Sequence, residues 1–155
     1  MGLDQETLQG QGMTSLRTRQ RLIERLTEKG ISDIRVLEAM RDTPRHLFLD
    51  EALSTRAYED LALPIGHQQT ISQPYIVAKM TEALIQHDKM SQKPLKNVLE
   101  IGTDCGYQSY ILSLFSKKVV SLERIKPLQE KAKKLLKGLK VTNVAFNLDD
   151  GSTIK

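Results

Sequence analysis

Two glycines and an acid are spaced in this sequence as they are in proteins that hold a nucleotide-like ligand. Gly102 and Gly106 bracket a five-residue turn that follows a short apolar run and precedes a segment of helical periodicity. Glycines let the backbone approach a ligand closely, and the helix N-terminus behind the turn favours a negative group. Glu123 follows about 20 residues later, where an acid hydrogen-bonds ribose hydroxyls in such proteins. The turn lacks G-x-G-x-x-G spacing, so an ordinary strand-to-helix turn with a surface acid is about equally favoured.

Two further segments carry polar side chains that could join this ligand site. Ser72 stands just before an expected helix, where the local sequence favours a helix N-cap over a hydroxyl held beside the ligand. Asp149-Asp150-Gly151 follows a third apolar run. An acid there could accept a hydrogen bond from an adenine amino group, but it also fits an ordinary Asp-Gly turn. The three histidines receive no role, and no Ser/His/Asp set is spaced for hydrolysis.

The second half of the chain alternates between short apolar runs and segments with apolar residues at helical spacing. We expect helices from Tyr107 and from Pro127, and strands over Asn97–Ile101, Lys118–Leu122 and Asn143–Leu148. This β-α-β-α-β order predicts the α/β class, in which helices cover a parallel sheet. The turns after the strands would then meet at one edge, bringing the acids to the glycine turn.

The first half of the chain predicts helices. A mobile tail over residues 1–13 precedes a helix that begins near Ser15 and stops at Gly30. A second helix follows Ser32, its expected N-cap, and is ended by Pro44.

Residues 45–73 are punctuated by proline and glycine and should form loops and short elements. A third helix should start near Pro74, a favoured first helical position, with four apolar residues on one face: Ile76, Met80, Ala83 and Leu84.

Composition excludes several classes of protein. The single cysteine allows no intrachain disulfide, and no Cys/His cluster suggests a metal site. No apolar run approaches the roughly 18 residues of a membrane span, and no secretory leader is visible, so we expect a soluble, cytoplasmic protein. The net charge is +4, but basic residues alternate with acids on expected helices and aromatic residues make up only 5%. We therefore expect no nucleic-acid partner and no membrane partner.

Four ordered segments resemble those of the protein-L-isoaspartate O-methyltransferase family. One of them, Leu63-Pro-Ile-Gly66 with Gln69-Thr-Ile-Ser-Gln-Pro-Tyr75, is peculiar to that family. The similarity runs from about Thr14 to Gly151 in the family's order. The other three segments are Thr43–Phe48, the glycine turn with its flanks (Val98–Thr103 and Gly106–Gln108), and Val120–Arg124 with its acid.

The resemblance implies a Rossmann-like class I methyltransferase fold, S-adenosylmethionine (AdoMet) as methyl donor, and the free carboxylate of isoaspartyl residues in damaged proteins as acceptor. Ser72 matches the active-site serine, and the neighbouring Thr70 and Ile71 are expected to contact the substrate. The residues implied to bind AdoMet are Glu100, Gly102, Thr103, Gly106, Glu123, Asp150 and Gly151. Such an enzyme needs no strong base, because the acceptor carboxylate is already ionised at neutral pH.

Asp104 and Cys105 depart from the family pattern, which usually has glycine and a small residue there. A charged Asp104 would face the carboxylate at the methionine end of AdoMet. Two like charges about 4 Å apart repel by roughly 4 kcal/mol at an effective dielectric of 20, so we expect weakened cofactor binding. Cys105 is expected to fill space rather than act as a nucleophile.

The chain ends just past the third expected strand, whereas a doubly wound domain has about six. We therefore expect an N-terminal helical and loop region over residues 14–92 and only the first half of the AdoMet-binding domain over residues 93–155. The free edge of its first strand invites aggregation or pairing, so we expect the polypeptide alone to be poorly folded or inactive. The alternative to an enzyme is a non-catalytic remnant that binds AdoMet or a partner.

Overall fold

The fold was obtained as a computed structural model, which describes residues 2–152. Met1 of the expected tail and residues 153–155 of the expected second region lie outside the described part. The helices are α1 (Gln5–Gln9), α2 (Leu16–Glu28), α3 (Ile34–Asp42), α4 (Pro74–Ile85), α5 (Tyr107–Phe115) and α6 (Lys126–Gly138). Short 3₁₀ helices span Gly12–Thr14, Arg45–Phe48 and Glu51–Arg56. The strands are β1 (Leu63–Gly66), β2 (Gln69–Ile71), β3 (Leu95–Ile101), β4 (Ser116–Glu123) and β5 (Val144–Leu148).

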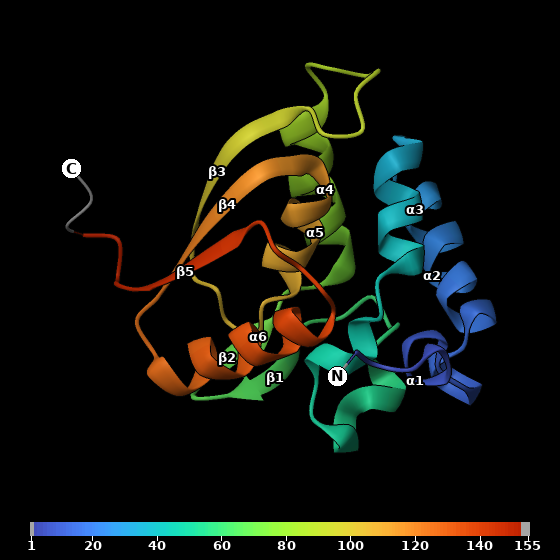
Figure 1. The fold of residues 1–155 in the computed structure, drawn as a ribbon. Helices are drawn as coiled ribbons and strands as arrows, with labels where there is room; N and C mark the ends of the chain where they lie inside the picture. Colours follow the sequence, from blue (N-terminus) through green and yellow to red (C-terminus); the bar gives the residue numbers. More distant parts are fainter. Residues whose placement is uncertain (1, 153–155) are drawn as a thin grey trace.

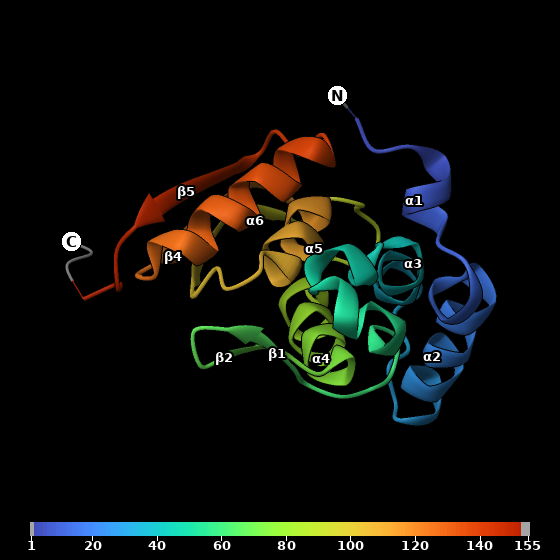
Figure 2. The ribbon, with the colours of Figure 1, turned by 90° about the horizontal axis from the view of Figure 1, so that it is seen from below.

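The three strands of the second half form the parallel sheet that the sequence predicts, in the order β3-β4-β5. Its register sets Glu100 beside Ser121 and Glu123 beside Leu148, so the carboxyl ends of the strands share one edge. Helices α5 and α6 connect the strands and lie side by side against the sheet (Figure 2). The α/β class and the parallel, three-stranded sheet are therefore confirmed.

Helices α2, α3 and α4 form a second group of helices. It packs against α5 and extends away from the sheet (Figure 1). One cluster of buried apolar side chains runs through both parts of the chain, from Leu22 on α2 to Leu136 on α6. The division into regions at residues 14–92 and 93–155 stays a prediction, but the two share this core. Among the described residues, no helix has both the length and the apolar character needed to cross a membrane.

The first residues differ from the expected mobile tail. The chain forms α1 and a 3₁₀ turn there, and two buried side chains from later in the chain contact the backbone of α1. Arg19 donates a hydrogen bond to the carbonyl oxygen of Leu8. A ring nitrogen of His46 lies 2.8 Å from the carbonyl oxygen of Thr7. Glycine and glutamine content gave no sign of these contacts, because both partners come from later in the chain.

Helix α2 has the ends that its sequence predicts, whereas α3 starts one residue later than expected. The hydroxyl of Ser15 accepts from the N–H of Thr18, and Gly30 follows α2 with φ 104°. The N-cap of α3 is Asp33, not Ser32, because the Asp33 carboxylate accepts from the N–H of Arg35.

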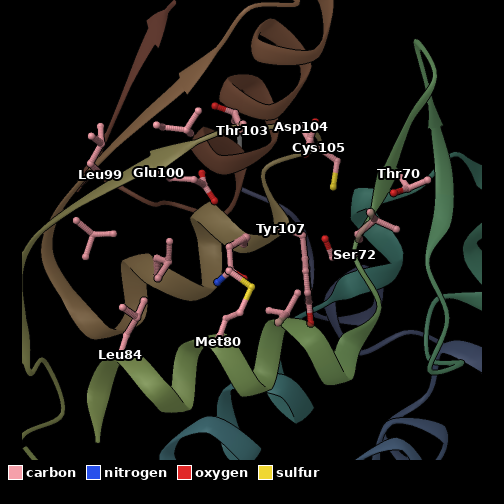
Figure 3. Close-up of a pocket in the computed structure, with 17 residues that line it drawn as sticks. Thr70, Ser72, Met80, Leu84, Leu99, Glu100, Thr103, Asp104, Cys105 and Tyr107 are labelled. Carbon is pink, nitrogen blue, oxygen red and sulfur yellow. The ribbon is translucent and has the colours of Figure 1, made fainter. Parts of the chain in front are cut away.

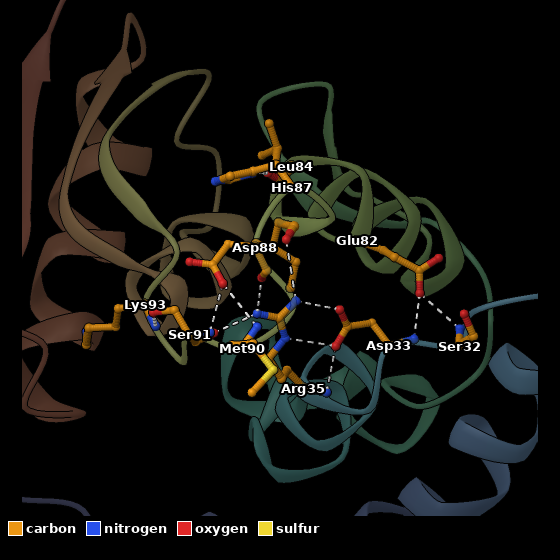
Figure 4. A network of polar contacts seen from close by, with 11 residues as sticks. Ser32, Asp33, Arg35, Glu82, Leu84, His87, Asp88, Met90, Ser91 and Lys93 are labelled. Atoms are coloured by element: carbon orange, nitrogen blue, oxygen red, sulfur yellow. Dashed lines mark hydrogen bonds and ion pairs between the residues drawn. The ribbon is translucent and has the colours of Figure 1, made fainter.

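Arg35 also fixes the polar connection between α4 and β3 (Figure 4). Its guanidinium donates to the carbonyl oxygens of Asp88 at 2.7 Å and Ser91 at 2.6 Å, and pairs with Asp33 at 2.7 Å. Hydrogen bonding from Arg35 holds the pKa of the Asp33 carboxyl below its usual range. This segment is thereby anchored to α3 by a charged side chain.

Candidate functional site

A cavity of about 320 Å³ lies between α4, the edge of β3, the start of α5 and the β1–β2 hairpin (Figure 3). Six of the predicted site residues line it: Thr70, Ile71, Ser72, Glu100, Gly102 and Thr103. Segments about 30 residues apart in the chain therefore meet at one hollow. The four other predicted residues do not line it: Gly106, Glu123, Asp150 and Gly151.

The glycine turn is tied to the end of the neighbouring strand. The N–H groups of Gly102 and Thr103 both donate to the carbonyl oxygen of Leu122, at 2.8 and 3.0 Å. Gly102 adopts φ 94°, and a Cβ placed on it would meet only Asp104 Oδ2, at 3.8 Å. The turn thus presents bare backbone to open space, as a close backbone–ligand approach requires.

Glu123 directly follows Leu122, so the acid stands beside the turn as its spacing predicts. Its side chain is only 4% exposed, and its Oε2 has no hydrogen-bond partner among the described residues. A buried carboxylate oxygen without a partner is costly unless a ligand supplies a donor. The backbone oxygen of Glu123 accepts from the N–H of Asp149 at 2.9 Å, which brings the third turn to the same edge.

Glu100 lines the cavity and belongs to a buried network of hydroxyl groups. Ser121 donates to its Oε1 at 2.6 Å and Ser109 donates to the same oxygen, whereas Oε2 has no partner in the described part of the chain. Thr103 Oγ1 lies 2.5 Å from Ser121 Oγ and continues the network into the turn. Burial raises the pKa of Glu100 from 4.5 to about 7, against the effect of the two serine hydrogen bonds.

This pKa makes the stability of the fold depend on pH. The folded state binds the Glu100 proton more tightly than the unfolded chain, so stability falls as pH rises from 4.5 to about 7 and then levels off. We expect a loss of about 3 kcal/mol, since one pKa unit is worth about 1.4 kcal/mol. Urea denaturation of Glu100→Gln between pH 4.5 and 8 should lack this slope, whereas exposed Glu130→Gln should keep it. Parallel profiles for Glu100→Gln and the unchanged protein would contradict the assignment.

The backbone of Asp104 is left-handed within the turn, with φ 51°. Left-handed backbone is tolerated by aspartate better than by most residues. Its side chain is half-buried and lines the cavity. Burial, and then the charge of Glu123, raises the pKa of Asp104. Cys105 next to it is a free thiol whose pKa is raised by burial to about 11, so it is unsuited to act as a nucleophile near neutral pH.

Ser72 is not the helix cap that its local sequence favoured. The N-cap of α4 is Gln73, and no side chain caps the helix there. The exposed hydroxyl of Ser72 has no hydrogen bond within residues 2–152 and lines the cavity beside exposed Thr70 and buried Ile71. Its backbone is held in place, since buried Arg45 donates to the Ser72 carbonyl oxygen at 2.9 Å.

Gly106, Asp150 and Gly151 have local roles outside the cavity. A Cβ on Gly106 would lie 3.0 Å from the Cβ of Ala132, so this glycine allows α5 to approach α6. Asp150 is exposed and accepts from the N–H of Ser152 at 2.8 Å, which is the ordinary turn geometry considered as the alternative. A Cβ on Gly151 would lie 3.2 Å from Ile101 Cδ1, beside the glycine turn.

Several residues that line the cavity had no predicted role in the site. Met80 and Leu84 belong to the apolar face expected on α4, and both line the cavity. Met80 is 58% exposed. Tyr107 and Gln108 come from the first turn of α5. The quoted motif contained Tyr107 and Gln108, but only the packing of α5 against α4 reveals that they face a cavity.

The sequence model of the family "Protein-L-isoaspartate(D-aspartate) O-methyltransferase (PCMT)" matches residues 17–153. The chain belongs to this family.

Relatives named protein-L-isoaspartate O-methyltransferase are 56% identical in Cellvibrio japonicus, over 93% of this chain and 62% of the relative. In Pseudomonas aeruginosa the identity is 58%, over 90% of this chain and 64% of the relative. A solved protein-L-isoaspartate O-methyltransferase superposes with a TM-score of 0.71 at 30% identity, over 86% of this chain and 42% of that one. The isoaspartyl methyltransferase fold is thus shared over most of this chain, which spans less than two thirds of the length of these curated relatives.

Proposed function

We propose that this chain carries the AdoMet site and the active-site serine of a methyltransferase that repairs isoaspartyl residues in proteins. The observation that carries the proposal is the shared cavity of Ser72 and the Gly102 turn. One segment supplies an exposed hydroxyl without a partner among the described residues, and the other supplies bare backbone beside buried Glu123. Membership of the isoaspartyl methyltransferase family supports the same assignment.

The residues present fit AdoMet in two respects. Gly102 leaves open space where a side chain would stand, and Glu123 Oε2 is a buried acceptor that lacks a donor. A ribose hydroxyl is the kind of donor that such an oxygen requires. We therefore assign the ribose to Glu123, and we propose that Gly102, Thr103 and Glu100 hold the rest of the cofactor. Gly106, Asp150 and Gly151 would shape this site through their turns.

The chemistry asked of the protein is mainly positioning. AdoMet supplies a methyl group on a positively charged sulfur, which makes the methyl open to attack by a carboxylate. The isoaspartyl carboxylate is ionised at neutral pH and needs no general base. We propose that the Ser72 hydroxyl donates a hydrogen bond to one carboxylate oxygen, leaving the other to attack in line. Thr70 and Ile71 would hold the peptide beside it. Without the enzyme, the neighbouring backbone amide nitrogen of the substrate then attacks the ester carbonyl, which forms a succinimide and releases methanol.

The proposal is tested by transfer of labelled methyl from AdoMet to an isoaspartyl peptide, with the matching aspartyl peptide as control. We expect label only on the isoaspartyl peptide. Ser72→Ala should lower the rate about a hundredfold, the scale of losing one positioned group at a reacting centre. Ser54→Ala, at a half-buried serine outside the cavity lining, should leave it unchanged. Equal rates for Ser72→Ala and the unchanged protein would remove Ser72 from the active site.

A second candidate is a non-catalytic remnant that binds AdoMet or a partner. It is favoured by Asp104, whose carboxyl group lies in the cavity where the family usually has no side chain. Cofactor binding by calorimetry without any methyl transfer would support this candidate.

The partners that we propose for the active form are isoaspartyl-containing proteins and peptides, without nucleic acid or membrane. The compartment that we propose is the cytoplasm, where an unpaired cysteine such as Cys105 is usual.

A further inference from the structure

Three carboxyl groups gather where the glycine turn meets the sheet. Glu100 and Glu123 are buried, and neither Oε2 has a hydrogen-bond partner within residues 2–152. Asp104 is half-buried, and its Oδ2 lies 3.8 Å from the place where a Cβ on Gly102 would stand. No ion pair among the described residues involves any of the three. The charge of Glu123 acts on both Asp104 and Glu100. A ligand in this part of the cavity therefore meets the negative charge of these groups, to which Glu100, with its pKa of about 7, contributes only in part near neutral pH.

This negative charge affects the binding of the two forms of the cofactor differently. AdoMet and its demethylated product, S-adenosylhomocysteine, share the adenine, the ribose, the amino group and the carboxylate. They differ by one methyl group and by the positive charge of the sulfonium. Repulsion between Asp104 and the shared carboxylate weakens both ligands alike and cancels from the ratio of their affinities. Attraction to the sulfonium remains, because only AdoMet carries it.

We propose that Asp104 is a specificity-determining residue that makes this site favour the cationic methyl donor over its neutral product. The inference rests on the proposed function, since it assumes that AdoMet occupies the cavity. The family resemblance implies acids at positions 100 and 123 and a glycine at position 104, so the preference contributed by Asp104 would be a property of this chain. It would let bound product leave more readily, although donor affinity is lower overall.

The test is calorimetric titration of the full chain with each nucleoside separately, for the unchanged protein and for Asp104→Asn. Asparagine keeps the size of the side chain and also tolerates left-handed backbone, so the variant removes mainly the charge. We expect the ratio of affinities, AdoMet over S-adenosylhomocysteine, to fall about tenfold, which corresponds to about 1.4 kcal/mol. Asp42→Asn, which alters the exposed carboxylate that pairs with Arg41, should leave the ratio unchanged.

A second measurement needs no variant and guards against a misfolded Asp104→Asn. An analogue with a protonated amine in place of the sulfonium should bind the unchanged protein more tightly than S-adenosylhomocysteine does. An unchanged ratio in Asp104→Asn, with both ligands bound more tightly, would show that Asp104 acts only on the shared carboxylate and would overturn the inference. Failure of every nucleoside to bind even Asp104→Gly would instead overturn the cofactor assignment, and this inference with it.

Discussion

Replacing Arg45 with methionine is expected to lower the free energy of unfolding by about 4 kcal/mol. Arg45 is 1% exposed, and its guanidinium donates to the carbonyl oxygens of Ala57 at 2.7 Å, Ser72 at 2.9 Å and Leu61 at 3.3 Å. It also lies 4.7 Å from the centre of the Tyr107 ring. Methionine keeps the apolar stem of the side chain but leaves three carbonyl groups without their donor, at about 1–3 kcal/mol each where they are buried. Urea denaturation followed by circular dichroism measures the loss.

The matched control is Arg41→Met, at an arginine whose side chain is 42% exposed and pairs with Asp42. A surface pair of this kind contributes about 0–1 kcal/mol, so its variant should unfold almost as the unchanged protein does. Because Arg45 holds the backbone of Ser72, Arg45→Met should also lose more methyl-transfer activity than its unfolded fraction explains. A change in unfolding free energy below about 1 kcal/mol would show that water replaces the guanidinium without cost.

The parallel sheet could be predicted from the sequence because its signals are local. Short apolar runs that alternate with segments of helical spacing identified β3, β4 and β5. Because the carboxyl ends of parallel strands share one edge, this order also predicted that Glu123 lies beside Gly102. The β1–β2 hairpin could not be predicted in the same way. Its turn residues, His67 and Gln68, have φ of 53° and 59°, where asparagine and glycine are the usual signal.

The cavity depends on contacts that periodicity does not describe. Helix α4 has apolar residues on several sides, so its sequence cannot tell which face is buried in the core. Val77, Ala78 and Ile85 are buried, whereas Met80 and Leu84 line the hollow. The role of Arg45 was equally hidden, because its three acceptors are 12, 16 and 27 residues further along the chain. Sequence motifs thus identified the chemical groups, and only the packing shows what holds them.

A second large loss of stability is expected when Gly106 is replaced with alanine. Gly106 has φ 88°, which costs an L-residue about 1–2 kcal/mol. A Cβ would also stand 3.0 Å from both Ala132 Cβ and Leu136 Cδ1 on α6, and overpacking of this kind costs about 1–3 kcal/mol. Together these effects predict a loss of about 3 kcal/mol in the free energy of unfolding, measured by urea denaturation.

Two other glycines separate backbone strain from close packing. Gly30 has φ 104° but no atom within 4 Å of its absent Cβ, so Gly30→Ala should lose only the strain contribution. Gly138 ends α6 with open space around it, and Gly138→Ala should be neutral or stabilising by up to about 1 kcal/mol. The excess loss in Gly106→Ala over Gly30→Ala then measures the contact between α5 and α6. If that excess were absent, close packing would not explain Gly106, and a direct role against the cofactor would become the better account of this glycine.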